Sequence, residues 1–102
     1  MTAQKILDYL NEAQIRCTYG AFGELTDTHA RFVAQRHLVE RRPEASWVVN
    51  GKTGEPTDYS QDKQHPNLFK NEVIIRTGEE LSRGIEEFQK QRQHVDNPNK
   101  RP

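Results

Sequence analysis

Hydrophobic residues in the first third of the chain recur at helical spacing. Within residues 3–14, Ile6 and Leu10 lie about one turn apart and Ala13 falls near the same side, which predicts a helix there with one apolar face. The stretch TYGAFGEL predicts a second helix, because Thr18 is a good N-cap residue and Phe22 would then face inward. The first third is therefore expected to be helical around a small core.

A third helix is expected from about residue 29 to residue 41. The polar cluster TDT at residues 26–28 forms the turn and cap before it, and Pro43 would stop it. Three short helices are thus expected to precede the first strand.

The second half of the chain has strand patterns. SWVVN is a strand candidate, and the NGKTG that follows favours a tight turn, because Asn and Gly accept positive φ. EPTDY would return beside that strand as an edge, since Pro56 lacks an N–H to donate. EVIIRT is the strongest strand candidate because β-branched residues dominate it.

The last predicted element is a helix over TGEELSRGIEEFQKQ. Thr77 and Glu80 make a capping box at its start, and Leu81, Ile85 and Phe88 form one apolar stripe. The order of elements fits an α+β fold of the winged helix-turn-helix type. It would have three N-terminal helices, a small antiparallel sheet and a C-terminal helix. Other small α+β folds also fit this order.

The composition limits the classes of protein to consider. A chain of 102 residues predicts one domain, assigned to residues 1–92, with a polar disordered tail over residues 93–102. The 15 basic and 15 acidic residues balance, so no global attraction to nucleic acid or membrane is implied. No apolar run is long enough to span a bilayer, and no secretory signal is visible. The single cysteine excludes an internal disulfide and favours a cytoplasmic location.

Three motifs carry a family resemblance. TYGAFGEL, then ARFV, then WVVNGKTG resemble the DNA-binding domain of O6-alkylguanine-DNA alkyltransferases and of the non-catalytic alkyltransferase-like proteins, over residues 5–58. The resemblance implies a winged helix that binds the minor groove of double-stranded DNA and recognises altered bases. It also implies that Tyr19 contacts a phosphate beside a flipped nucleotide and that Arg31 takes the place of the extruded base.

The sequence departs from that family where the chemistry would lie. Ala45 stands where the alkyl-accepting cysteine, or the tryptophan that substitutes for it, is expected, and Glu40 stands at a position usually held by asparagine. The only thiol, Cys17, precedes the second predicted helix, outside that loop. Alkyl transfer needs a thiolate beside a base. We therefore predict a protein that is not an enzyme.

The predicted third helix offers a surface for nucleic acid. Arg31, Gln35 and Arg42 at i, i+4 and i+11 would share one face, which could equally be an ordinary solvated face. Arginine and glutamine read base edges and contact phosphates. The predicted DNA-binding residues are Tyr19, Thr28, Arg31, Gln35, Arg36, Arg41, Arg42 and Lys52.

Trp47 has two interpretations. It could pack in the core between the strand and the helices, or it could line a pocket that stacks on an extruded base.

The sequence predicts no metal site and no cofactor. The four histidines are scattered, and those at 29 and 37 lack the i, i+4 spacing of a helical metal pair. We expect a non-catalytic DNA-binding protein of bacterial or phage origin. The alternative is a protein-binding adaptor or inhibitor with the same fold, which zero net charge and the acidic last helix favour.

Overall fold

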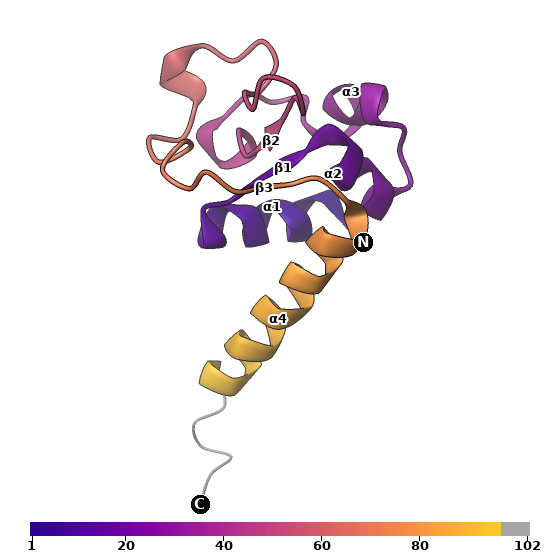
Figure 1. Cartoon of the computed structure of the whole chain (residues 1–102), viewed down its shortest axis with the longest axis vertical. Coiled ribbons are helices and arrows are strands. Elements are labelled where there is room, and N and C mark those ends of the chain that lie inside the picture. Colours follow the sequence, from indigo (N-terminus) through magenta and orange to yellow (C-terminus); the bar gives the residue numbers. More distant parts are fainter. Residues whose placement is uncertain (97–102) are drawn as a thin grey trace, which may run out of the picture.

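The computed structural model describes residues 1–96, and it describes side chains as far as residue 91. Within these residues, four α-helices, three 3₁₀ turns and three short strands form an α+β arrangement (Figure 1). None of the helices in this part of the chain is long and apolar enough to cross a membrane.

The strands form a small parallel sheet. β1 (Arg16–Thr18) lies in the middle, with β2 (Val48–Val49) on one side and β3 (Ile74–Ile75) on the other. Cys17 is the residue of β1 that pairs with both neighbours. Parallel strands need a long crossover connection, and a long segment links each strand here to the next.

The predicted antiparallel sheet is therefore wrong, although the NGKTG turn forms. The Gly54 N–H donates to the Asn50 carbonyl at 2.8 Å, and the Asn50 N–H donates to the Glu55 carbonyl at 2.9 Å. Gly54 has a φ of 73°, which glycine adopts without strain. Beyond the turn, Pro56 has no N–H for a ladder, and the chain continues to η3 (Gln61–Lys63) instead of returning beside β2.

Three helices match their predicted positions: α1 (Ala3–Ala13), α2 (Tyr19–Thr26) and α4 (Gly78–Asp96). The Thr18 hydroxyl caps α2 by accepting a backbone N–H at 3.1 Å, as predicted. The Thr77 hydroxyl likewise accepts a backbone N–H of α4 at 3.2 Å. Side-chain oxygens at these positions satisfy N–H groups that have no partner within the helix.

The third helix is much shorter than the predicted span of 29–41. It consists of η1 (Ala30–Phe32) and α3 (Val33–His37). Leu38 caps α3 and is only 6% exposed, so the chain turns inward at that point. The next turn, η2 (Pro43–Ala45), begins with proline, and the residue before a proline disfavours helical geometry. The residues between His37 and Pro43 therefore leave the helix early.

The hydrophobic core lies between the sheet, α1, α2 and the first half of α4. Burial of these side chains supplies most of the driving force for folding. The largest fully buried side chains are Trp47, Phe22, Ile6, Leu10, Leu68, Leu81 and Ile85.

The C-terminal helix α4 extends away from the rest of the described chain (Figure 1). Leu81 and Ile85 are buried, and Phe88 is half-buried with its ring 5.5 Å from that of Tyr9. α4 continues to Asp96, past the predicted domain end at residue 92. The rest of the predicted tail, residues 97–102, lies outside the described residues.

Candidate nucleic-acid interface

The parallel sheet brings the carboxyl ends of its three strands to one edge. Tyr19 follows β1, Asn50 follows β2 and Arg76 follows β3. Ligands of open parallel sheets commonly bind at this edge, outside the ends of the strands. A shallow depression of about 510 Å³ lies there, and its lining includes Tyr19, His29, Arg31, Asn50, Gly51 and Arg76.

The depression has a positive electrostatic character. Arg31 and Arg76 both line it and both are exposed, whereas none of the aspartates and glutamates described by the structure lines it. Within residues 1–91, whose side chains are described, neither arginine forms an ion pair. Two guanidinium groups without carboxylate partners favour an anion at this position.

Both arginines are held in place by neighbouring groups. The Arg31 guanidinium lies over the Phe32 ring, 5.0 Å from its centroid. Arg76 Nη1 donates a hydrogen bond to the Gly51 carbonyl at 2.9 Å. This bond fixes Arg76, which follows β3, to the turn that follows β2. Because a guanidinium has five N–H donors, the other donors of Arg76 can bind a ligand.

Tyr19 connects the depression to the segment after the turn. Its hydroxyl accepts a hydrogen bond from the Thr57 N–H at 3.0 Å. Asn50 Oδ1 accepts from the Lys52 N–H at 2.8 Å, which orders the turn, and Lys52 itself is exposed. The structure thus brings the predicted Tyr19 and Arg31 together and places Lys52 on the turn beside them.

The predicted helix face is wrong in one part. Gln35 and Arg36 are exposed on α3, but the helix ends at His37, so Arg42 does not continue that face. Arg42 instead lies 3.5 Å from Glu40 and 3.8 Å from Glu44, with its charge locally compensated.

Arg41 is also engaged with other groups. It lies 3.8 Å from an Asp58 carboxylate oxygen and 6.0 Å from the centroid of the Tyr59 ring. Exposed ion pairs of this kind are weak, yet they reduce the net positive charge that a phosphate would meet. Arg41 therefore contributes less to a basic surface than its sequence position implied.

Thr28 and Trp47 both form hydrogen bonds within the protein. The Thr28 hydroxyl donates to the Thr26 carbonyl at 3.1 Å and lies 2.9 Å from His37 Nε2. Trp47 is 0% exposed, and its Nε1–H donates to Asn11 Oδ1 at 3.0 Å. A side chain buried in this way packs in the core and presents no ring face on which a base could stack.

Arg76 was missed by sequence reasoning. It lies beyond residue 58, where the family resemblance ends, and a lone arginine after a strand carries no motif. The feature that could have indicated it is its position at the end of EVIIRT, the strongest strand candidate. If the strands had been predicted to be parallel, the residue after each of them would have been a candidate ligand contact.

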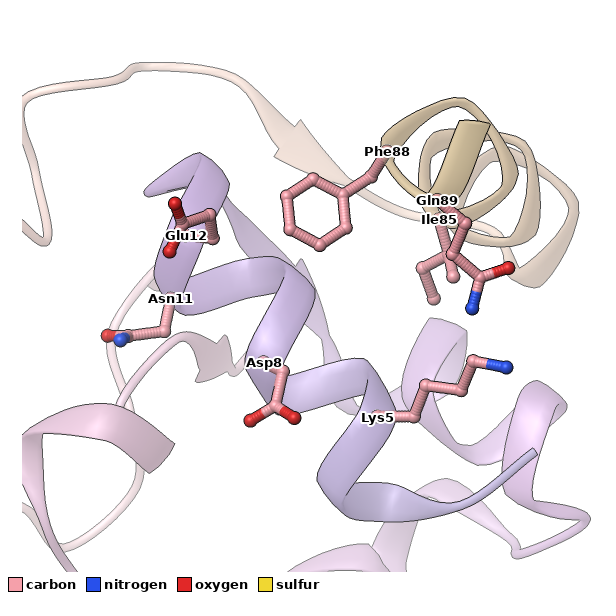
Figure 2. A pocket seen from close by; sticks show the side chains of 7 residues that line it. All are labelled: Lys5, Asp8, Asn11, Glu12, Ile85, Phe88 and Gln89. Atoms are coloured by element: carbon pink, nitrogen blue, oxygen red, sulfur yellow. The ribbon is translucent and has the colours of Figure 1, made fainter. Parts of the chain in front are cut away.

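A second depression of about 380 Å³ lies between α1 and α4 (Figure 2). Figure 2 shows the Phe88 ring projecting from α4 into the space toward α1. Asp8 and Glu12 contribute two carboxylates to its lining, and Lys5 contributes one ammonium group. The excess of carboxylates makes this depression unsuitable for a phosphate backbone.

Cys17 is fully buried at the centre of the sheet. Burial raises the pKa of its thiol, so the thiolate that nucleophilic chemistry needs is disfavoured. Among the described residues, no group of three or more His, Cys, Asp or Glu side chains could hold a metal ion.

We expect the Cys17 thiol to react with Ellman's reagent about a hundredfold more slowly in native buffer than in urea, because access requires unfolding. The thiol of an unfolded chain has a pKa of about 8.5, whereas burial keeps the folded thiol protonated. This group's contribution to stability is therefore complete below that pH and declines above it. Equal reaction rates with and without urea would contradict the burial of Cys17.

Comparisons with family models, with curated proteins and with solved structures find no match.

Proposed function

We propose that this protein binds double-stranded DNA without catalysing a reaction, in the manner of the alkyltransferase-like proteins that its first half resembles. The observation that carries the proposal is that Arg31, Arg76 and Tyr19 line one depression at the carboxyl edge of the sheet, in which none of the described carboxylates takes part. Phosphate contacts by arginine supply most of the affinity of such proteins for DNA.

The arrangement of helices supports the same proposal. α2 and the η1–α3 segment pack against each other across a short turn, as in a helix-turn-helix. Gln35 and Arg36 are exposed on the second of these helices. The turn that carries Lys52 would act as the wing, even though no antiparallel hairpin supports it among the described residues. Minor-groove binding and recognition of altered bases complete the proposal and rest on the resemblance.

Fluorescence anisotropy with labelled DNA tests the proposal. We expect a complex with a duplex at low salt, with affinity that falls steeply as salt rises. Arg31→Ala should weaken binding about tenfold and reduce the salt dependence by about one released ion. Single-stranded and alkylated duplex DNA test the finer proposals about substrate.

Arg83→Ala is the matched control, since Arg83 is exposed on α4 and pairs with Glu79 at 2.8 Å. It removes one positive charge outside the proposed interface and should leave the affinity almost unchanged. The DNA-binding proposal fails if the wild-type protein forms no complex with any of these DNAs at low salt.

A protein-binding adaptor is the second candidate, and exposed hydrophobic side chains favour it. Phe69 is 50% exposed and Val73 is 55% exposed, both in the segment that leads to β3. Contiguous exposed apolar surface is typical of protein contacts, and these two side chains lie four positions apart in that segment. A stoichiometric co-purifying protein that is lost in Val73→Asp, together with no DNA complex, would support this candidate.

A further inference from the structure

We propose that the depression at the carboxyl edge of the sheet binds one phosphate group of the DNA backbone, held between Arg31 and Arg76. The inference rests on the proposed DNA binding and adds to it a residue outside the segment that resembles the alkyltransferase family. Arg76 is the phosphate contact that positions the strand, and Arg31 lines the same depression.

The first step of the argument is the placement of Arg76. Its Nη1–H is bound to the Gly51 carbonyl at 2.9 Å, so part of the guanidinium is already ordered before any ligand binds. Ordering a long side chain at an interface normally costs free energy, and an ordered arginine avoids part of that cost. The planar guanidinium also offers paired N–H donors that match phosphate oxygens.

The second step is the space beside the guanidinium. A methyl group added at Gly51 would lie 3.6 Å from Arg76 Nη1 and 3.5 Å from Thr18 Cγ2, which are ordinary contact distances. At Gly20 the nearest atom would be Thr18 Oγ1 at 3.7 Å. These two glycines carry no side chain into the lining, so a phosphate can approach the backbone closely at these two positions.

The third step is the electrostatic environment. α2 begins at Tyr19, in the lining of the depression, and the N-terminal N–H groups of a helix carry partial positive charge. This field adds to the two guanidinium groups. The aromatic ring of Tyr19 has its hydroxyl bound to the Thr57 N–H, and the remaining lining is polar or small. Two guanidinium groups in a lining that holds none of the described carboxylates suit a phosphate.

The test measures DNA affinity against salt for the full chain carrying Arg76→Ala, Arg76→Lys or Gly51→Ala, with Arg83→Ala as the control. Arg76→Ala should weaken binding about tenfold and reduce the slope of log K against log salt by about one. Arg76→Lys keeps the charge, so the slope should persist while affinity falls. Gly51→Ala should weaken binding by narrowing the depression, with an unchanged circular dichroism spectrum and melting temperature.

A second measurement locates the phosphate. Duplexes that carry a single neutral methylphosphonate linkage are scanned along each strand with the wild-type protein and with Arg76→Ala. At one linkage the wild type should lose affinity while Arg76→Ala loses none, because both changes remove the same contact. If Arg76→Ala is poorly folded, Arg76→Gln takes its place in the scan, because it also removes the charge and keeps more of the side chain.

Each outcome decides the matter. The phosphate site is overturned if Arg76→Ala keeps the affinity and the salt slope of the wild type, or if both proteins lose affinity at every linkage. The DNA-binding proposal would still stand in that case if Arg31→Ala weakens the complex. Absence of any wild-type complex would overturn the proposed function and the phosphate site together.

Discussion

Replacing Trp47 with alanine should lower the free energy of unfolding by about 3–5 kcal/mol, the range found for truncating a large buried aromatic side chain. Trp47 is 0% exposed, and its ring lies 4.7 Å from that of His65. The substitution would leave a cavity and also remove the donor to Asn11 Oδ1. Urea unfolding followed by circular dichroism measures the loss, since Trp47 is the only tryptophan for fluorescence.

Trp47→Phe separates the two contributions of this side chain. It keeps most of the buried apolar area and removes the indole N–H, so stability should fall by about 1–3 kcal/mol. The same variant tests the earlier hypothesis of a base pocket. A core tryptophan predicts that folded Trp47→Phe binds DNA as the wild type does. Unchanged stability combined with weaker DNA binding would instead show that Trp47 contacts the ligand.

The helices could be predicted because their signals are local. Thr18 and Thr77 each lie just before an apolar stripe and cap it, and a side-chain oxygen there satisfies nearby N–H groups whatever the rest of the chain does. The early end of α3, in contrast, has no local sequence signal. Leu38 leaves the helix to become buried, and that burial depends on residues far along the chain.

The sheet could not be predicted for a related reason. β1 is Arg16–Thr18, a strand of only three residues, and all three are buried, so its burial does not alternate along the strand. Arg16 is 7% exposed because its guanidinium donates to the Gly54 carbonyl at 2.8 Å and the Asn71 carbonyl at 3.0 Å. Those partners are distant in sequence, so nothing near Arg16 indicates that it belongs to a central strand.

The residues of the candidate site differ in the same way: some have a local sequence signal and others do not. Tyr19 and Arg31 could be named from the motifs at the start of α2 and in η1. Arg76 could not, since its importance depends on β3 lying parallel to β1, with its carboxyl end beside Gly51. Arg42 was overvalued because the helix was extended in the prediction past its real end.

Replacing Gly23 with alanine should destabilise the fold by about 1–3 kcal/mol, the usual cost of forcing an extra group into a packed site. A Cβ at Gly23 would collide with the backbone carbonyl oxygen of Thr28 and lie 3.3 Å from Val33 Cγ2. The Thr28 N–H also donates to the Gly23 carbonyl at 2.9 Å, so the two segments cannot separate without losing this bond. Thermal unfolding should show a melting temperature lower by roughly 4–8 °C for each kcal/mol lost.

Gly20→Ala is the matched control in the same helix. The nearest atom to its new Cβ would be Thr18 Oγ1 at 3.7 Å, an ordinary contact distance. Alanine should therefore stabilise α2 by up to about 1 kcal/mol. Opposite signs for the two substitutions would locate the effect in the contact between α2 and the turn before η1. Because that contact positions Arg31 and α3, folded Gly23→Ala should also bind DNA more weakly than the wild type. Equal stability of the two variants would mean that the close approach of Gly23 to Thr28 does not exist in solution.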